Sequence, residues 1–457
     1  MIENFVYRYK KEKILYNVAL IYPNKYKIGI SSLGFQWVYH LLQSTPWIYC
    51  ERAFLNDGRI KTVENSIPIE DFDIIFFSIS FENDILNIIS ILLNANIKLY
   101  SKDREKPLVC IGGIATTIIP QYLKEIADII FCGDAELTLL PFLEVLKKTR
   151  EKDKIIELAT KIKGIYSDNL SSTYLPYYSS NDEIIPHSVI ISDEAEFKNT
   201  ALILVSKGCL YRCKFCFVSN IYENYQPLPA EKILQTALIY KNFTDRIGLI
   251  AATLTNHPDF KFIVTELNKA GFMVSFSAFR VETLDEEFLK TIVENENKTL
   301  VIAPETSSQK LKKLIGKFIP DEVIFEKIRI ACEAGIKRLK LYFMIGLPEE
   351  EKEDIDQIIS FIAKVREISI YHSRKFGYIP EIIVDINPFV PKPFTPLFES
   401  EMEDINSLRK KLIYIKNKVR KYGRIYVYGE SPKSSYLQYL LAKNKISFDE
   451  LLSFRDS

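Results

Sequence analysis

Three cysteines within eight residues are the clearest sign of chemistry in this chain. Cys209, Cys213 and Cys216 follow one another with three and two residues between them. Cysteine thiolates bind the irons of a [4Fe–4S] cluster, and cysteines this close in one loop can wrap one corner of it. Because no fourth cysteine lies nearby, one iron remains open to a cofactor or substrate. Zinc is the alternative, but structural zinc sites have four ligands, and the nearest downstream histidine, His257, is 41 residues beyond Cys216.

The other cysteines are scattered, so the chain has no disulfide framework. Cys110 lies within an apolar run, Cys132 ends another, and Cys50 is far from both. A second cluster on these three thiols is an alternative, but their wide spacing disfavours it. Buried cysteines are usually inert small hydrophobic residues, and we expect that role here.

Composition limits the classes of function. The 457 residues are 47% hydrophobic, enough for two or three domains with their own cores. The formal net charge of +1 gives no electrostatic signature for nucleic acid, which is therefore not the expected partner. No apolar run is long enough to span a membrane, and residues 1–5 do not begin a signal peptide. These features predict a cytoplasmic protein.

The cysteine motif directly follows the first strand of a predicted barrel. Six βα-type units predict a partial (β/α)6 TIM-type barrel over 196–400, which would build its site at the carboxyl ends of its strands. A helical extension is expected over 401–457, with a charged helix face over 409–424. The expected strands are 201–205, 247–251, 273–277, 299–303, 338–344 and 382–386.

The first 150 residues predict a separate α/β domain. Short apolar runs alternate with helical segments and glycine-bearing loops, which is typical of a doubly wound, Rossmann-like parallel sheet. Such sheets bind ligands at the carboxyl ends of their strands. The charged and then Ser/Asn/Tyr/Pro-rich segment 151–195 is predicted to be a linker. The expected strands are 18–21, 73–79, 108–111 and 129–131.

The cysteine spacing, with the aromatic Phe215 before the last cysteine, resembles the signature of the radical S-adenosylmethionine (SAM) superfamily. The resemblance implies an enzyme with a [4Fe–4S] cluster whose open iron binds SAM and cleaves it reductively to a 5′-deoxyadenosyl radical. Most of the chain resembles one branch, whose members carry an N-terminal cobalamin-binding-like domain. The segments that carry this likeness are 22–26, 33–36, 50–54, 77–82, 112–113, 133–134, 275–280, 303–306, 343–349, 387–393 and 431–438.

The resemblance to this branch suggests residues for binding SAM at the strand ends of the barrel. Arg280 suits the carboxylate of SAM, because its planar fork can pair bidentately, and Glu305 suits the ribose or the amine. The alternative for both is a structural ion pair. Many superfamily members hold the SAM amine with a Gly-Gly-Glu segment, but residues 251–258 contain no carboxylate, so the amine contact stays unassigned. Weaker candidates are Thr253 and Ser277 for polar contacts, and the backbone near Phe215 and Ile345 for adenine.

A cobalamin site is expected where small residues end the N-terminal strands, since they let a corrin ring approach the backbone. The Asp-x-His-x-x-Gly motif that supplies a cobalt ligand in many cobalamin proteins is missing. His40, the only histidine in residues 1–150, is expected not to bind cobalt. The alternative is a domain that binds no cofactor. The predicted corrin-facing residues are Ser78, Ser80, Gly112, Gly113 and Gly133.

The resemblance to the cobalamin branch implies a cobalamin-dependent radical SAM methyltransferase that acts on an unactivated carbon. One alternative is a radical SAM enzyme without cobalamin, which would perform methylthiolation, oxidation or rearrangement. Another is a non-enzymatic iron–sulfur electron carrier. The expected partners are an electron donor such as ferredoxin or flavodoxin and a substrate that is a small molecule, a lipid precursor or a peptide.

Overall fold

The computed structural model describes residues 2–56, 58–166, 178, 184–276, 280–289 and 299–454. The chain divides into two compact units. Unit 1 comprises Met1–Ile203, Glu231–Ile247 and Asn444–Ser457, and unit 2 comprises Leu204–Ala230 and Gly248–Lys443. Each unit is described below by itself.

Unit 1 contains the predicted doubly wound sheet. Its five strands pair in parallel in the order β3-β2-β4-β5-β6, so the first strand lies beside the second and the third. This is the flavodoxin-like order, in which ligands bind at the point where the strand order reverses. That point lies between β2 and β4. The strands are β2 (Tyr16–Tyr22), β3 (Ile48–Phe54), β4 (Ile74–Ser78), β5 (Leu108–Gly112) and β6 (Ile129–Ile130).

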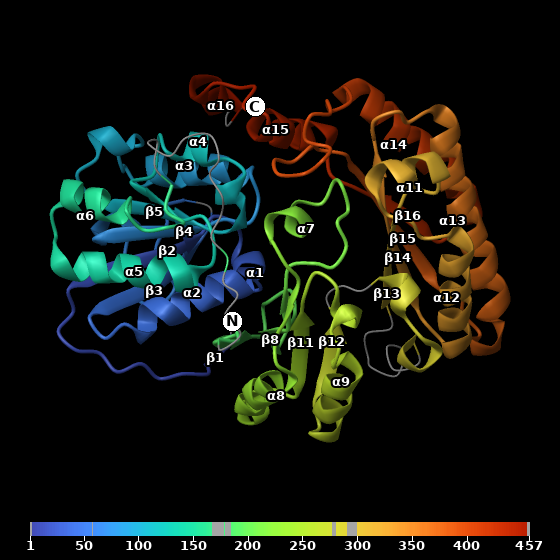
Figure 1. Ribbon diagram of the computed structural model, residues 1–457, viewed down its shortest axis with the longest axis horizontal. Helices are drawn as coiled ribbons and strands as arrows, with labels where there is room; N and C mark the ends of the chain where they lie inside the picture. Colours follow the sequence, from blue (N-terminus) through green and yellow to red (C-terminus); the bar gives the residue numbers. More distant parts are fainter. Residues whose placement is uncertain are drawn as a thin grey trace. The chain divides into compact units, whose positions relative to one another are not determined.

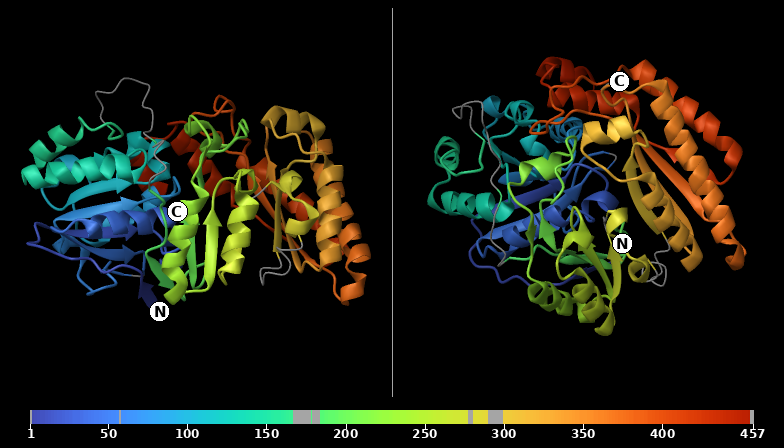
Figure 2. Two further views of the ribbon diagram at one scale, coloured as in Figure 1. Left: turned by 60° about the horizontal axis from the view of Figure 1, so that its bottom comes forward. Right: turned by 45° about the vertical axis from the view of Figure 1, so that its right-hand side comes forward.

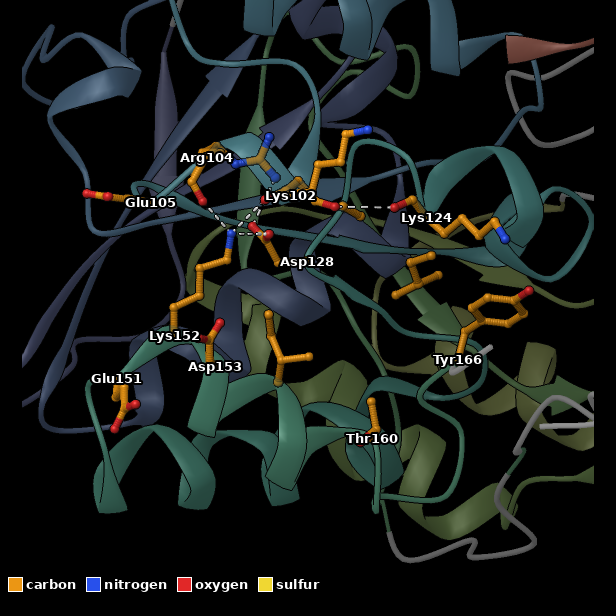
Figure 3. Close-up of a pocket in the computed structure, with 14 residues that line it drawn as sticks. Lys102, Arg104, Glu105, Lys124, Asp128, Glu151, Lys152, Asp153, Thr160 and Tyr166 are labelled. Carbon is orange, nitrogen blue, oxygen red and sulfur yellow. Dashed lines mark hydrogen bonds and ion pairs between the residues drawn. The ribbon is translucent and has the colours of Figure 1, made fainter. Parts of the chain in front are cut away.

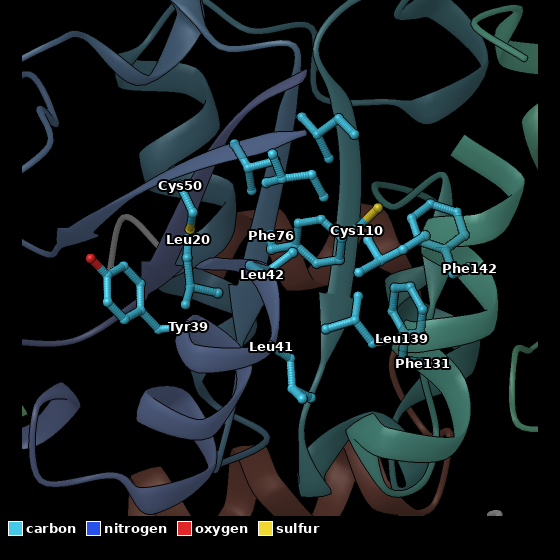
Figure 4. Packing of buried hydrophobic residues seen from close by; sticks show 14 of the residues in the cluster. Leu20, Tyr39, Leu41, Leu42, Cys50, Phe76, Cys110, Phe131, Leu139 and Phe142 are labelled. Carbon is cyan, nitrogen blue, oxygen red and sulfur yellow. The ribbon is translucent and has the colours of Figure 1, made fainter. Parts of the chain in front are cut away.

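One hydrophobic cluster of unit 1 lies between the sheet and helices α2 and α5 (Figure 4). Phe142 of α5 meets Phe76 of β4 and Phe131 edge-on, with ring centroids 6.2 and 5.2 Å apart. Cys110 of β5 lies fully buried in the same cluster. The helices of this unit are α1 (Tyr26–Gly29), α2 (Leu33–Ser44), α3 (Asp84–Asn94), α4 (Pro120–Leu123), α5 (Ala135–Lys148), α6 (Lys152–Ala159), α8 (Ala230–Leu238) and α16 (Phe448–Phe454).

The predicted linker, 151–195, contains regular structure at both ends. Helix α6 packs through Ile155 and Ala159 into the core of unit 1. Strand β7 (Ile190–Ser192) pairs antiparallel with β1 (Glu3–Phe5). Apolar residues spaced four apart and the run Val189–Ile191 account for these elements, because each buries hydrophobic surface.

All six strands predicted for the barrel are present. β8, β11 and β12 form one sheet in the order β12-β11-β8, and β13, β14, β15 and β16 form a parallel sheet in that order. With the five-stranded sheet of unit 1, they confirm the predicted α/β fold class. The strands are β8 (Thr200–Leu204), β11 (Arg246–Ile250), β12 (Met273–Phe276), β13 (Thr299–Glu305), β14 (Arg338–Ile345), β15 (Glu381–Pro388) and β16 (Ile425–Tyr428).

Helices α12 and α13 cover one face of the β13–β16 sheet (Figures 1 and 2). Phe343 of β14 packs edge-on against Phe361 of α13, with centroids 5.6 Å apart. The helices of unit 2 are α7 (Phe217–Ile221), α9 (Phe260–Lys269), α11 (Gln309–Ile315), α12 (Asp321–Ala334), α13 (Lys352–His372), α14 (Ile405–Val419) and α15 (Pro432–Ala442).

The C-terminal extension is mainly helical but adds strand β16, which the sequence analysis did not predict. The alternating Ile425-Tyr426-Val427-Tyr428 consists of good strand formers, and it pairs in parallel with β15. No helix among the described residues is long and apolar enough to cross a membrane.

Candidate functional site

The cysteine loop, residues 208–225, projects from a short hairpin. Strand β9 (Ser206–Lys207) pairs antiparallel with β10 (Gln226–Pro227) and closes the base of the loop. Gly208 has φ +69°, and a Cβ there would lie 2.7 Å from the carbonyl oxygen of Asn224. Only glycine fits this turn without strain, so Gly208 allows the chain to enter the loop immediately before Cys209.

Side-chain hydrogen bonds to backbone carbonyl groups stabilise the cysteine loop. The side-chain amide of Asn220 donates to the carbonyl oxygens of Cys213 and Cys216, at 3.0 and 2.7 Å. The Ser219 hydroxyl also donates to the Cys216 carbonyl, at 3.0 Å. These hydrogen bonds therefore hold the loop through the carbonyl groups of two of its cysteines.

The middle of the loop is anchored to the end of helix α11 (Gln309–Ile315) and to the segment that follows β15. Lys214 donates its N–H to the carbonyl of Ile315, at 2.9 Å, and accepts from the N–H of Leu397, at 3.2 Å. Phe215 packs on an apolar cluster that includes Phe389. The carbonyl of Ile345 accepts from the N–H of Phe389, at 2.8 Å. The two residues predicted to flank adenine thus both adjoin this apolar cluster.

The three loop cysteines are free thiols in different surroundings. Cys213 is buried, whereas Cys209 and Cys216 are partly exposed. Burial raises the pKa of the Cys213 thiol, and the cations of Lys317 and Arg280 oppose that rise. Nearby cations favour thiolates, the form that binds iron.

Arg280 lies against the cysteine loop. Its Nη1 is 4.0 Å from the sulfur of Cys213, and its guanidinium carbon is 3.8 Å from the ring centroid of Tyr211. Its Nε donates to a carboxylate oxygen of Glu282. The hydroxyl of Thr253 lies 4.0 Å from the sulfur of Cys209. Two predicted residues are therefore brought to the cysteines.

Glu305 ends β13 with φ +66°, a conformation that is rare outside glycine. Its carboxylate accepts from the ammonium of Lys317, at 2.8 Å, and Lys317 is only 8% exposed. Glu305 and Arg280 thus both lie in ion pairs, the alternative considered for each, and their contacts with SAM stay predictions. Ser277 lies outside the described residues.

Sequence reasoning missed Lys317, Tyr211 and Glu282. Glu282 stands two residues from its partner Arg280, so their pairing was readable from the sequence. The partner of Lys317 is Glu305, twelve residues away, and only the fold brings the two together.

The cysteine loop suits an iron–sulfur cluster and not a single metal ion. Among the described residues, no three His, Cys, Asp or Glu side chains could hold a single metal ion together. A [4Fe–4S] cube differs because each thiolate binds a different iron and the sulfurs lie farther apart. Three free cysteines on one loop, with two cations beside the buried one, fit such a cluster.

The small residues predicted for a corrin lie at the strand ends of unit 1. Ser78 ends β4, Gly112 ends β5, and Gly133 follows β6 with φ +139°. Gly113 has φ +112°, and a Cβ there would lie 2.2 Å from the carbonyl oxygen of Ile79. Close packing within unit 1 is therefore enough to require glycine at 113.

The loop after β4 is held by a buried carboxylate. Asp84 accepts from the N–H groups of Ser80 and Phe81, at 3.2 and 3.1 Å. Burial raises the pKa of Asp84 to about 6, although these hydrogen bonds oppose the rise. The Ser80 hydroxyl also accepts from the Tyr22 hydroxyl, at 3.1 Å, across the point where the strand order reverses.

His40 lies inside unit 1 and not at a strand end. Its Nδ1 is 2.9 Å from the Tyr9 hydroxyl, and its ring stacks on Trp37 with centroids 4.8 Å apart. Burial, together with the nearby His187, lowers the pKa of His40 to about 4. Its position supports the expectation that it does not bind cobalt.

A cavity of about 590 Å³ lies in unit 1 near the amino ends of β5 and β6 (Figure 3). Asp128 there is paired with Arg104, at 2.9 Å, and with Lys152, at 2.7 Å. None of the predicted site residues lines this cavity. The ion pairs of Asp128 hold the amino ends of β5 and β6 in place.

Two family models match the chain: "Radical SAM proteins, N-terminal" over residues 34–167 and "Radical SAM superfamily" over residues 203–362. An uncharacterized protein of Methanocaldococcus jannaschii is 30% identical over 97% of this chain and 92% of its own length. A ribosomal protein uS12 methylthiotransferase of Acetivibrio thermocellus is 24% identical over 78% of this chain and 81% of its own.

Two solved structures share the fold. The radical SAM methyltransferase TsrM of Kitasatospora setae gives a TM-score of 0.56 at 13% identity, covering 84% of this chain and 75% of that chain. The cobalamin-dependent SAM radical enzyme OxsB gives 0.53 at 16% identity, covering 95% of this chain and 62% of that chain. Together with the cysteine loop, the family matches show that the chain belongs to the radical SAM superfamily and is a radical SAM enzyme.

Proposed function

We propose that Cys209, Cys213 and Cys216 hold a [4Fe–4S] cluster and that the enzyme methylates an unactivated carbon with the help of cobalamin. The cysteine loop itself is the observation that supports the cluster. Asn220 donates hydrogen bonds to the carbonyl groups of Cys213 and Cys216, and two cations lie near Cys213. When bound, the cluster would supply one electron that breaks a carbon–sulfur bond of SAM and releases methionine and a 5′-deoxyadenosyl radical.

The residues around the loop would bind SAM and exclude water from the radical. Thr253 would offer its hydroxyl beside Cys209, and Arg280 would present its guanidinium to the carboxylate of SAM. The apolar cluster that packs on Phe215 would provide a dry wall for adenine, since Phe389 and its neighbours are buried. A dry site protects a reactive radical from side reactions.

The fold of unit 1 supports the cobalamin part of the proposal. Its sheet has the flavodoxin-like order, and Ser78, Gly112 and Gly133 lie at carboxyl ends of its strands. When bound, cobalamin would supply the methyl group. With His40 in helix α2, hydrogen-bonded to Tyr9 and stacked on Trp37, this unit would hold the corrin without a histidine on cobalt.

Methylthiolation is the second candidate, because the Acetivibrio thermocellus relative is named as a methylthiotransferase. A second cluster for that reaction would need further ligands, and the cysteines of unit 1 are poor ones. Cys50 is 1% exposed, and Cys110 and Cys132 are 0% exposed. The burial of these thiols favours the methyltransferase.

Reconstitution with hydroxocobalamin tests this choice. The full chain, loaded anaerobically with iron and sulfide, is desalted after incubation with the corrin and its visible spectrum is recorded. A retained corrin band at one equivalent is expected. Loss of the band on desalting would remove the cobalamin proposal and leave the cluster proposal standing. In the cell, an electron donor such as ferredoxin or flavodoxin would reduce the cluster.

A further inference from the structure

One segment of unit 2, residues 405–429, carries a strong local positive charge and is called the basic segment below. Eight of its 25 residues are lysine or arginine, and none is aspartate or glutamate. The net charge of the whole chain, +1, averages over this excess and does not exclude a partner that binds only here. The segment comprises α14, the 3-10 turn Arg420–Tyr422 and strand β16.

Most cations of the basic segment are exposed and lack a carboxylate partner. Lys411 is the exception, because it pairs with Glu350 and Glu403, both at 2.6 Å. Elsewhere in unit 2, exposed helix cations are paired, as Arg329 of α12 is with Glu326 and Glu333. Six exposed cations of the segment form no ion pair with any described residue: Arg409, Lys416, Lys418, Arg420, Lys421 and Arg424.

A buried arginine adds to this charge from the neighbouring helix. Helix α13 packs against α14 (Figure 1), and its Arg366 is only 5% exposed. Arg366 donates to the carbonyl oxygens of Tyr422 and Pro380, at 3.2 and 3.1 Å, and no described carboxylate pairs with it. Burial lowers the pKa of Arg366, and the positive charge of Arg424 lowers it further. Buried charges are usually paired, so two like charges left together suit an anion from outside.

Two exposed aromatic rings follow Arg424 on strand β16. Tyr426 is 44% exposed and Tyr428 is 60% exposed. Residues two apart in a strand lie on the same face, so both rings belong to one face of β16. In the described part of the sheet, β16 is the last strand and its outer edge is unpaired. Exposed aromatic rings beside cations are typical of surfaces on which unpaired bases stack.

The arrangement fits a nucleic acid better than a membrane. Each nucleotide offers a phosphate and a flat base, which match the cations and the two tyrosines. A helix that binds a membrane surface needs a free apolar face. In α14 the apolar residues Leu408, Ile415 and Val419 are buried, so that face is occupied. Bases are stacked and paired within a duplex, whereas RNA exposes them in loops and ends.

We propose that the basic segment is a docking surface for single-stranded regions of RNA. The exposed cations would track the phosphates, and Tyr426 and Tyr428 would stack on bases. The buried charge of Arg366 would strengthen the positive field around Arg424. This partner lies beyond the proposed methyl transfer, and its binding requires neither SAM nor cobalamin.

The first test measures the salt dependence of RNA binding. Fluorescence anisotropy follows a labelled, unstructured RNA of about 16 nucleotides on full-length protein carrying its cluster, at several salt concentrations. For the triple variant Arg420→Gln/Lys421→Gln/Arg424→Gln we expect affinity to fall by about tenfold or more. The slope of log affinity against log salt should fall by about two, because three phosphate contacts are lost. A matched control removes three exposed cations of unit 1, in Lys13→Gln/Lys147→Gln/Lys148→Gln, and should change neither quantity.

The second test separates RNA from other polyanions. Tyr426→Leu and Tyr428→Leu are each expected to weaken RNA by about fivefold or more with an unchanged salt slope, since stacking releases no counterions. Binding of polyglutamate should not change in either variant. Tyr371→Leu is the control, because Tyr371 is a 65% exposed ring on α13 outside the basic segment.

Three results would overturn the proposal. The first is wild-type protein that carries its cluster and binds no RNA. The second is equal weakening by the two triple variants, which would show that the charge acts without a defined place. The third is loss of binding to phosphatidylserine vesicles in the Arg420, Lys421 and Arg424 triple variant with RNA binding unchanged, which would assign the surface to a membrane. None of these results bears on the cluster or on methyl transfer.

Discussion

The cysteines of unit 1 and those of the cysteine loop in unit 2 lie in different environments. In unit 1, Cys50, Cys110 and Cys132 are buried, and burial raises the pKa of Cys50 and Cys110 well above the usual thiol value. In the cysteine loop of unit 2, two of the three cysteines are partly exposed and the buried one lies near two cations. Residue type alone does not distinguish a cysteine that binds metal from one that packs in the core. The exposure of the thiol and the positive charge near it make that distinction.

The same contrast applies to the small residues at strand ends. Gly113 in unit 1 is required by the backbone of Ile79, so its presence says little about a cofactor. Gly208 in unit 2 is also required by a close approach, but the turn that it allows leads directly into three cysteines. A glycine becomes informative about function through the residues that it positions.

The largest effect is expected for the loop cysteines. Cys213→Ala removes one of three iron ligands, and we expect loss of most bound iron and of 5′-deoxyadenosine formation by about a thousandfold or more. Iron and sulfide analysis after anaerobic reconstitution measures the first effect. Cys110→Ala is the control, because that thiol lies in the core of unit 1 and its loss should leave the iron content unchanged. Equal losses of iron in both variants would erase the contrast between the two units.

A smaller effect is expected at the strand ends of unit 1. Gly113→Ala forces a Cβ against the carbonyl of Ile79 and should destabilise the fold by roughly 3 kcal/mol or more. Gly112→Ala is the matched control: its Cβ would meet only the Cβ of Phe131, at 3.5 Å, an ordinary contact. Thermal unfolding compares the two, and equal midpoints would show that packing does not explain Gly113.

The buried Asp84 predicts a pH dependence in unit 1. Because the folded pKa of Asp84, about 6, exceeds the ordinary carboxyl value of 3.8, the folded state binds the proton more tightly, and the contribution of Asp84 to stability is lost as pH rises between these values. Asp84→Asn removes this dependence while it keeps an acceptor for the two N–H groups. We expect the stability difference between variant and wild type to change by about 1–3 kcal/mol from pH 4 to pH 7. A constant difference across that range would contradict the burial argument.

The smallest effect is expected at Thr253. Thr253→Val removes a hydroxyl 4.0 Å from the sulfur of Cys209 but keeps the side chain's shape. We expect full iron content and a loss of SAM affinity of no more than about tenfold, the value of one neutral hydrogen bond. Equilibrium dialysis measures it, with Thr236→Val on α8 as a control outside the site. If the variant lost iron instead, Thr253 would be needed to hold the cysteine loop in the shape that binds the cluster.

The fold was largely readable from the sequence, because buried parallel strands are continuous apolar runs. All six barrel strands appear where they were expected, within one or two residues at most ends. β16 was missed because its four residues stand in a tail rich in lysine and arginine. Helix α6 was missed because its short apolar face lies among charged residues.

The candidate site was readable only where its residues are close in sequence. The cysteine spacing identifies the loop, and Arg280 stands beside Glu282. The pairing of Glu305 with Lys317 and the stacking of Arg280 on Tyr211 depend on tertiary structure. The partner of each charged group therefore could not be predicted from spacing alone.

The cluster proposal is tested most directly by SAM cleavage under a strong reductant. Anaerobically reconstituted protein is incubated with SAM and dithionite, and 5′-deoxyadenosine is quantified by chromatography against the Cys213→Ala variant. We expect 5′-deoxyadenosine from the wild type and none above background from the variant. Wild-type protein with a full complement of iron and sulfide that yields no 5′-deoxyadenosine would contradict it.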